Sequence, residues 1–329
     1  MLENLTRRQF ASVLGLACGH LSLASVSRAQ NARLGKIIIG FPAGGTMDVT
    51  ARRIAEALRA QGKNYIVESR PGAAGRIANA QLKRENSDGS VMLCTTTSTM
   101  TIYPHVYEKL GYDVVNDFKP LSTVAEVSCA FAVSSAVPTS VNTLRDFVAW
   151  AKTQPQGISY ASTAAGSSAH FLGFSFEQAA GVNMTHVPYK GAAAAFQDML
   201  GGHIAGYLGV IGDFLSTEGS AYYRLLAVTS ATRSRFLPQV PTFTESGYPT
   251  VVGTATYGLF LPPKTPDAIS SELADAVRAA MGDAALIAGF HKVAIEAISC
   301  RPDQYSKLIC DESNAWKPIV LASGFKSEE

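Results

Sequence analysis

Strand-like and helix-like segments alternate along this chain, and that alternation is the strongest constraint on its fold. Lys36–Phe41 has the apolar composition of a short buried strand, and Met47–Ala60 carries apolar residues near helical spacing. Tyr65–Glu68, Gly75–Arg84 and Val91–Thr95 continue as strand, helix and strand. This β-α-β-α-β order predicts an α/β protein with a mostly parallel sheet and helices on its faces.

The same alternation continues toward the C-terminus. Further strands are predicted at Ala125–Ser134, Ile158–Ala161, His186–Tyr189, Ala205–Val210, Leu225–Thr229 and Tyr257–Leu261. Further helices are predicted at Leu144–Lys152, Ala169–Ala179, Ala192–Leu200, Asp267–Met281 and Asp303–Ser323. Pro318 should kink or divide the last helix. The 329 residues suffice for two domains of ~150 residues, and without a low-complexity linker we expect strands to cross between them as a hinge.

Charge and motif content exclude several function classes. Lys and Arg total 28 against 26 Asp and Glu, so the chain has no electrostatic footprint for nucleic acid. There is no GxSxG, Walker, GxGxxG or HExxH motif, and no histidine has a partner at metal-ligand spacing. We therefore expect no enzyme, no cofactor and no metal. Beyond the N-terminal segment no apolar run reaches about 18 residues, so the mature chain is not expected to be embedded in a membrane.

Residues 1–29 are predicted to be a signal peptide. Arg7 and Arg8 precede a mostly apolar stretch, and small residues precede a cleavage position after Ala29. The run around the two arginines resembles a twin-arginine export motif without its usual downstream Lys, so twin-arginine and ordinary Sec export both stay open. Cys18 lacks the lipobox Leu, because Gly15 occupies that position. The mature protein is expected in the periplasm.

Four cysteines follow the predicted cleavage position, in a compartment that would be oxidising. Cys94 and Cys129 lie in strand-like segments and are expected to be small buried hydrophobic residues. Cys300 and Cys310 flank a predicted helix start, and a disulfide between them is left open. No pair forms a CxxC motif, so a redox function is not indicated.

Three Gly-rich turns each precede a predicted helix: Phe41–Thr46, Arg70–Gly75 and Ser162–Ser168. Free N–H groups and the positive end of the helix dipole make such turns anion sites, and glycines admit close approach of a ligand. We predict that the turns face one another across a cleft and hold a small carboxylate. The alternative is that Gly, Ser and Thr merely end strands and start helices, with Thr46 and Ser167 or Ser168 as N-caps.

A few side chains near these turns are candidate functional residues, and each also has a structural alternative. His170 follows the third turn, where it would orient the loop or donate to a ligand; a purely structural role is the alternative. Asp48 would be a general base only in an enzyme, because an acidic residue in a first helical turn usually complements the dipole. Tyr103, Tyr189 and Tyr257 are candidates to line the cleft or to serve as half-buried scaffold.

Taken together, these motifs resemble the periplasmic solute-binding proteins of tripartite tricarboxylate transporters, the Bug family. The resemblance rests on Gly40–Asp48, Glu68–Gly75, Tyr112-Asp113 with Asp117-Phe118, Thr185–Gly191, Leu226–Ser230, Leu237–Thr242 and Trp316. It spans nearly the whole mature chain. It implies a two-domain, type II periplasmic-binding (venus-flytrap) fold, each domain a mixed sheet flanked by helices. Residues 30–129 plus 254–329 would form domain 1, and residues 130–253 domain 2.

The resemblance also implies a function and a site. The ligand would be a small di-, tri- or aromatic carboxylate, and the partner an inner-membrane permease, with the binding protein itself a monomer. One carboxylate would lie against the first turn and the opposite end against the third, with Ser98 and Thr99 as further donors. The expected ligand-binding residues are Pro42, Ala43, Gly44, Gly45, Thr46, Asp48, Ser98, Thr163, Gly166, Ser167, Ser168, His170 and Tyr189.

One departure from the family pattern bears on the ligand. The family often has an acidic residue after a GG-(Q/H)-(I/V) stretch, but here Gly201–Ile204 leads into Ala205. A partner for a ligand amino group would then be missing, which weakens the case for an amino-acid ligand. Two rival functions stay open: a carboxylate sensor that signals to a two-component receptor, and a secreted hydrolase or isomerase that uses Asp48 or His170.

Overall fold

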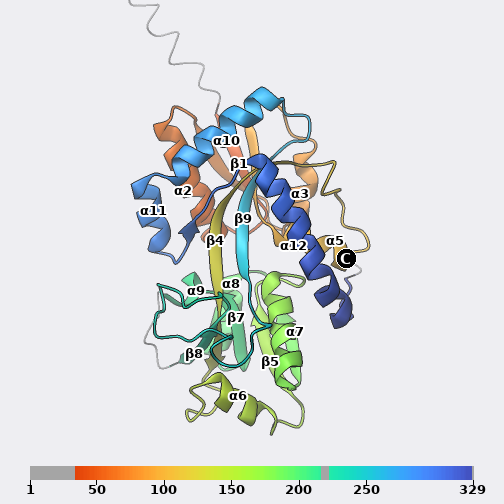
Figure 1. Ribbon diagram of the computed structural model, residues 1–329, viewed down its shortest axis with the longest axis vertical. Coiled ribbons are helices and arrows are strands. Elements are labelled where there is room, and N and C mark those ends of the chain that lie inside the picture. The colour runs from red at the N-terminus through yellow and green to blue at the C-terminus, as the bar shows by residue number, and fades with distance from the viewer. Residues whose placement is uncertain (1–33, 216–221, 328–329) are drawn as a thin grey trace, which may run out of the picture.

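The structure is a computed structural model that describes residues 34–215 and 222–327. These residues form an elongated molecule whose upper and lower halves are connected by the long strands β4 (Lys119–Ser134) and β9 (Thr254–Leu261) (Figure 1). The signal peptide and the motif predicted within residues 1–29 lie outside the described residues.

The strands of the described chain belong to one continuous mixed sheet. Besides β4 and β9 they are β1 (Gly35–Ile39), β2 (Tyr65–Ser69), β3 (Val91–Thr96), β5 (Ile158–Ser162), β6 (Met184–Pro188), β7 (Gly206–Val210), β8 (Tyr223–Val228) and β10 (Glu296–Ala297). The order is β2-β1-β3-β9-β4-β7-β5-β6, with β8 and β10 also paired to β4. The β1, β2 and β3 strands pair in parallel, as do β5, β6 and β7, while β4 and β9 run antiparallel to their neighbours.

Helices cover the sheet in both halves (Figure 1). The longer ones are α2 (Thr46–Ala60), α6 (Leu144–Ala151), α7 (Ser168–Ala180), α8 (Ala192–Leu200), α10 (Asp267–Met281), α11 (Ala284–His291) and α12 (Pro302–Ser323). The shorter ones are η1 (Ala73–Gly75), α3 (Arg76–Leu82), α4 (Ser98–Thr101), α5 (Tyr103–Val106) and α9 (Gly212–Leu215). The sequence did not predict α4, α5, α9, α11 or β10.

The first strand and helix show why the sequence folds this way. Ile37, Ile38 and Ile39 of β1 are fully buried, because β1 is an interior strand with helices over the sheet. On α2 the buried positions include Ile54 and Leu58, one turn apart, so this helix packs one apolar face on the sheet. The α/β architecture predicted from the alternation is confirmed.

The long strand β4 holds the two halves together. Its first part, Lys119 to Ser128, pairs with β9, and its second part, Cys129 to Ser134, pairs with β7 and β8. The prediction began this strand at Ala125, six residues late. Pro120 explains the error, since proline lacks the N–H that a strand interior needs and argues against one in the sequence; the structure accommodates it beside an irregularity in the register.

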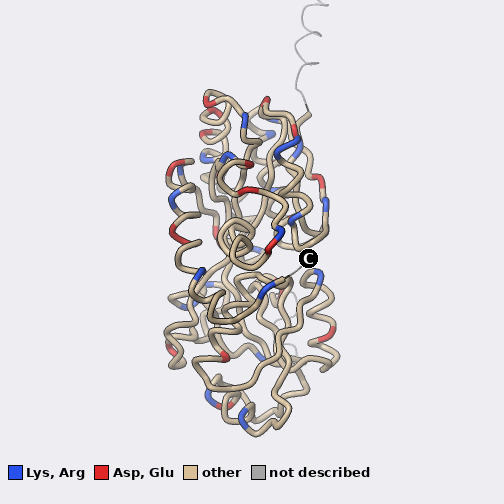
Figure 2. Tube along the Cα trace, turned by 90° about the vertical axis from the view of Figure 1, so that its right-hand side faces the viewer, with Lys and Arg blue, Asp and Glu red and all other residues tan. Residues whose placement is uncertain are grey.

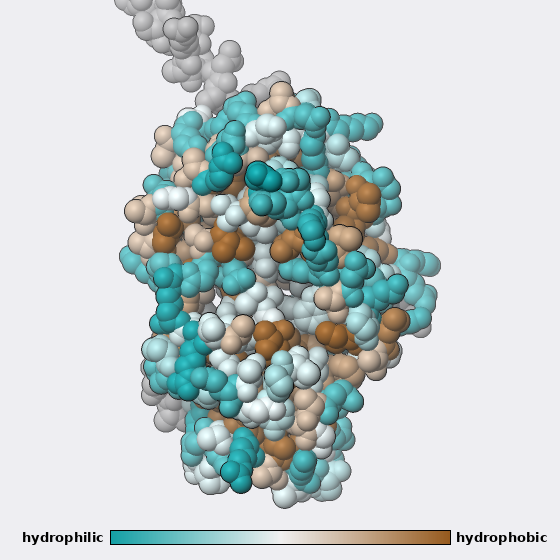
Figure 3. All heavy atoms as spheres, viewed as in Figure 1, coloured by the Kyte–Doolittle hydropathy of each residue, from teal (hydrophilic) through white to brown (hydrophobic). Residues whose placement is uncertain are grey.

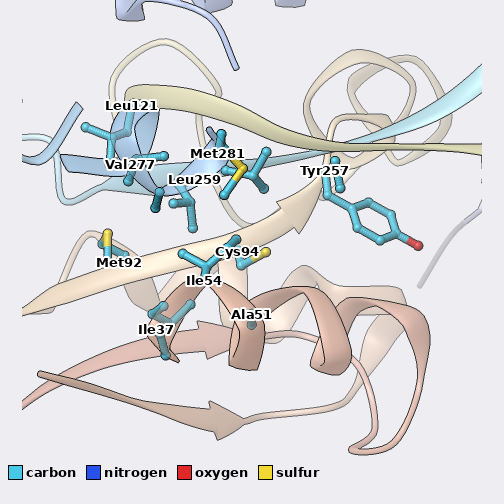
Figure 4. Close-up of a cluster of buried hydrophobic side chains, with 14 of the residues drawn as sticks. Ile37, Ala51, Ile54, Met92, Cys94, Leu121, Tyr257, Leu259, Val277 and Met281 are labelled. Carbon is cyan, nitrogen blue, oxygen red and sulfur yellow. The ribbon is translucent and has the colours of Figure 1, made fainter. Parts of the chain in front are cut away.

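Buried side chains gather separately in each half. One cluster of the upper half, part of which Figure 4 shows, packs Ile37, Ile54 and Met92 against Leu259 and Val277. A lower cluster is built on residues between Cys129 and Val251. The division into residues 30–129 plus 254–329 and residues 130–253 stays a proposal.

Three smaller predictions can be compared with the structure. Cys94 and Cys129 are buried as expected, and Cys300 and Cys310 are both free thiols, so the disulfide left open between them is not formed. Cys300 instead contacts Thr123 on the sheet while Cys310 is exposed. The last helix continues past Pro318 and is not divided there.

The surface carries mixed charge. Figure 2 shows Lys and Arg interspersed with Asp and Glu, with no face of a single sign in that view. Of the helices in the described part of the chain, none is both long and apolar enough to cross a membrane.

Candidate ligand-binding cleft

A cavity of about 590 Å³ lies between the two halves. It is lined from the upper half by the first turn of α2 and by residues near α4 and α5, and from the lower half by the first turns of α7 and α8. Cys129, Ala255 and Tyr257, on the crossing strands β4 and β9, form part of its wall. The surface is hollowed at the middle of the molecule in Figure 3.

The turn before α2 presents main-chain groups to this cavity. Pro42, Ala43, Gly44 and Gly45 are exposed along its lining, and Thr46 is half-buried. The N-cap of α2 is Gly45 and makes no side-chain cap, so Thr46 is the first helical residue and not the N-cap that the sequence predicted. The first N–H groups of an uncapped helix have no intrahelical partner and stay available to an anion.

Asp48 lies behind this turn and not in the cavity lining. Its Oδ2 accepts hydrogen bonds from the Gly44 N–H at 3.0 Å and from Nε of Arg52 at 2.9 Å. Burial would raise the pKa of Asp48, but the hydrogen bonds from Arg52 and Gly44 lower it overall. Asp48 therefore fixes the shape of the turn as an ionised group, and its lowered pKa makes it a weak general base.

The third turn enters the cavity from the lower half. Thr163, Ser167 and Ser168 line it, and the Ser167 side chain caps α7 by accepting a hydrogen bond from the His170 N–H. Gly166 is not in the lining. Its φ of +74° is a left-handed conformation that glycine adopts readily, and it lets the chain turn between the lining residues Thr163 and Ser167. A Cβ there would stand 3.5 Å from the Tyr103 ring of the upper half.

His170 is buried beneath the third turn. Its Nδ1 accepts a hydrogen bond from the Gly166 N–H at 3.2 Å, and its ring stacks on His186, with centroids 3.8 Å apart. Nε2 of His186 is 2.7 Å from the Ser162 hydroxyl. Burial lowers the pKa of His170 to about 4 and that of His186 to about 3. Both rings are thus neutral at pH 7, and His170 positions the loop without lining the cavity.

The sequence missed a fourth turn, Tyr189–Ala192, which connects β6 to α8. Lys190, Gly191 and Ala192 line the cavity. Gly191 is the N-cap of α8 at a φ of +111° and provides no side-chain cap, and a Cβ there would meet open space. Tyr189, a predicted site residue, is outside the lining, and its hydroxyl donates to Asp198. A glycine between a strand and a helix was the signal, as at the other turns.

The second turn, Arg70–Gly75, does not line the cavity, contrary to the hypothesis that all three turns face the cleft. It lies one layer behind, where the Tyr103 hydroxyl donates to the Ala74 carbonyl at 3.1 Å. Tyr103 itself is in the lining, as is Ser98. Tyr257 also lines the cavity, and in Figure 4 its ring points away from the buried cluster beside it.

Nine of the thirteen predicted residues therefore lie together on one cavity: Pro42, Ala43, Gly44, Gly45, Thr46, Ser98, Thr163, Ser167 and Ser168. Asp48, Gly166, His170 and Tyr189 support its walls from behind. Among the described lining residues only Lys190 and Asp213 are acidic or basic. No group of three His, Cys, Asp or Glu in the described ranges is placed to hold a metal ion. The cavity can bind an anion chiefly through neutral donors and helix dipoles.

Two halves connected by crossing strands, with a cleft of helix N-termini between them, define the chain as a periplasmic-binding-type solute receptor. Comparison with known proteins agrees. Residues 50–325 match the family described as the tripartite tricarboxylate transporter family receptor, TctC. The chain belongs to this family, and its members are solute receptors and not enzymes.

Individual relatives extend the match to most of the chain. BugT of Bordetella pertussis is 29% identical over 327 residues, which cover 98% of this chain and 99% of that protein. The solved structure of the periplasmic binding protein BugD is 26% identical with a TM-score of 0.81, covering 89% of this chain and 98% of that one. The structure of R. palustris Rpa4515 with adipate is also 26% identical, with a TM-score of 0.85 over 90% of this chain and 99% of that one.

Proposed function

We propose that this chain captures a small carboxylate in the cleft and delivers it to the permease of a tripartite tricarboxylate transporter. One observation carries the proposal. The helices α2 and α8 have Gly45 and Gly191 as N-cap residues, which provide no side-chain cap, and both N-termini open onto the same cavity from opposite halves. A carboxylate that bridges them would receive main-chain hydrogen bonds and favourable dipole energy from each half.

The same arrangement supports a mechanism of ligand-driven closure. The ligand would stabilise the closed state through its higher affinity for two half-sites brought together than for either alone. β4 and β9 are the elements that would bend, since they connect the halves. Neutral donors suit this role, because they lose less hydration on closure than a buried arginine pair would, and waters can adapt the site to its ligand.

The relatives support the ligand class. Rpa4515 was solved with adipate, a dicarboxylate, and shares the fold over nearly its whole length. The family description itself names a tricarboxylate transporter receptor. For this chain a cavity of about 590 Å³ leaves room for a carboxylate of that size together with water.

The location and partner complete the proposal. Export by the signal peptide predicted at residues 1–29 would place a monomeric receptor in the periplasm, where a permease in the inner membrane would collect the ligand. Uptake of the ligand by cells that carry the permease, and its loss when this chain is deleted, would support transport. Uptake that is unchanged, with loss of a transcriptional response to the ligand, would support the sensor instead.

The test of binding is thermal unfolding of residues 30–329 against tricarboxylates, C4–C6 dicarboxylates, acidic amino acids, nicotinate and benzene dicarboxylates. A ligand at 100 times its Kd adds about 2.7 kcal/mol to the free energy of unfolding, which raises the Tm by a few degrees. A saturable shift with one class is the expected result. A folded protein with no shift across the panel would contradict the proposal.

A further inference from the structure

The cleft contains one carboxylate that the proposed function leaves unused. Asp213, in the short helix α9 that follows β7, lines the cavity. Its Oδ2 accepts a hydrogen bond of 2.7 Å from the hydroxyl of Tyr207, and a main-chain group of Val210 provides another. A carboxylate has about four acceptor positions. Asp213 therefore keeps acceptor capacity that these two hydrogen bonds do not use.

The groups that face Asp213 do not neutralise it. They are Tyr207 on β7, Cys129 on β4 and Tyr257 on β9. Burial raises the pKa of all three side chains, and it raises the pKa of Cys129 to about 12. All three are uncharged near neutral pH. Lys190 lines the same cavity, but it forms no ion pair with Asp213 among the contacts of the described residues. Asp213 is the single acidic side chain in the described lining.

This position constrains the ligand. Burial raises the pKa of Asp213 to about 6, with the Tyr207 and Val210 hydrogen bonds opposing the rise, so the side chain is mostly ionised at pH 7.5. An ionised carboxylate in a cavity of reduced dielectric repels a second carboxylate of a ligand and attracts a cation. A hydrogen bond between an ammonium group and this carboxylate would be charge-assisted. The first carboxylate of the ligand would still be held at the helix N-termini.

We propose that Asp213 selects a carboxylate ligand that also carries a protonated amine, with the amine bonded to the Asp213 carboxylate on the side that faces the cavity. The inference rests on the proposed function and narrows its ligand class from carboxylates in general to aminocarboxylates. Asp213 is then a specificity-determining residue, and Tyr207 a positioning residue that holds its Oδ2.

The test compares ligands of equal length by calorimetry on residues 30–329 at pH 7.5. The probes are adipate, 2-aminoadipate and 6-aminohexanoate. At least one amino-bearing probe should bind about ten-fold or more tighter than adipate. Asp213→Asn keeps an acceptor for Tyr207 but removes the charge. This substitution should lower the affinity for the amino-bearing probe about ten-fold and leave the affinity for adipate unchanged or higher.

The chain offers a matched control. Asp198 accepts a hydrogen bond of 2.6 Å from the Tyr189 hydroxyl, so it forms the same kind of Tyr–Asp pair, but it does not line the cavity. Asp198→Asn should leave the ratio of the affinities as it is in the unmodified chain. A second arm uses no substitution: lowering the pH from 7.5 to 5.5 protonates Asp213 and should reduce the preference for the amino-bearing probe.

The outcomes distinguish a failure of this inference from a failure of the proposed function. Adipate binding tighter than both amino-bearing probes, with a ratio that neither Asp213→Asn nor pH changes, would overturn the role of Asp213 and leave the carboxylate receptor standing. If the folded chain binds none of the probes, nor any member of the wider carboxylate panel, the proposed function fails and the inference fails with it.

Discussion

The imidazole rings of His170 and His186 stack with their centroids 3.8 Å apart and their planes 15° apart. Burial lowers the pKa of His170 to about 4 and of His186 to about 3, so both rings are neutral in the folded protein. In the unfolded chain each would titrate near 6.5. The unfolded state therefore binds more protons below that pH, and folding stability is lost as the pH falls from about 6.5 toward the folded values.

We expect a loss on the order of 2 kcal/mol per histidine at pH 5 relative to pH 7. Denaturant unfolding at several pH values measures it. His186→Gln removes one of the two titrations and keeps a partner for Ser162, so the loss between pH 7 and pH 5 should become smaller by on the order of 2 kcal/mol. An acid slope identical to that of the unmodified chain would show that the pair does not titrate in this way.

Lys190 stands exposed at the fourth turn and is the only Lys or Arg in the described lining of the cavity. Lys190→Met should weaken carboxylate binding several-fold, equivalent to about 1 kcal/mol, and should reduce its dependence on salt. Lys152→Met is the control, because Lys152 is also exposed but belongs to the end of α6, away from the cavity. Equal affinities for the two variants would place the ligand away from α8.

The sequence predicted the helices and strands better than it predicted which turns come together at the cleft. Strand and helix periodicity predicted β1, α2, β3, α8 and α10 closely, since each is formed by local pattern. Which turns reach the cleft depends on the order of the strands and on packing between them, which a local pattern does not contain. The second turn was therefore placed in the cleft in error, while the fourth, with the same glycine signal, was overlooked.

Asp213 shows a different limit. Its helix α9 spans only Gly212–Leu215, too short for a periodicity to predict. Ala205 in the sequence indicates that a partner for a ligand amine is missing, but the structure brings an acidic side chain to the cavity eight residues later. Only the fold brings this residue beside Tyr207 and Tyr257.

Ionised Asp213 should also lower the free energy of unfolding of the ligand-free protein at neutral pH. Its pKa is raised from 3.8 to about 6 in the fold, so the folded state favours the protonated acid and stability decreases as the pH rises through about 6. Asp213→Asn should raise the free energy of unfolding by on the order of 1–3 kcal/mol at pH 8 and by little at pH 4. Urea unfolding at both values measures the difference, and a gain that is the same at both would contradict the ionisation.

The thiols of residues 30–329 should differ sharply in reactivity. Burial raises the pKa of Cys94 and of Cys129 to about 12, and both are inaccessible, while Cys310 is exposed. Iodoacetamide should therefore modify Cys310 first in the native protein, and Cys94 and Cys129 only after unfolding. Mass spectrometry of peptides checks this. A reducing agent should leave the Tm unchanged, and a fall of several degrees would indicate a disulfide after all.

The first turn provides the sharpest test of where the ligand lies. Gly45 has a φ of −79°, and the nearest atom to an added Cβ is the Pro42 carbonyl oxygen at 3.7 Å, so Gly45→Val should fold normally. Its side chain would enter the space in front of the α2 N-terminus and should weaken carboxylate binding about ten-fold or more. Calorimetry measures the affinity, and the Tm of the empty protein reports on the fold.

Gly282→Val is the matched control for this substitution. Gly282 also has a negative φ, of −88°, and a nearest contact at 3.5 Å, but it lies between α10 and α11 and not in the cavity lining. Gly166→Val is a weaker test, because its φ of +74° strains any side chain by about 1–2 kcal/mol, so lost binding and lost stability would coincide. If Gly45→Val and Gly282→Val bind the ligand equally well, the carboxylate is not held at the α2 N-terminus, and the site must be sought elsewhere in the cleft.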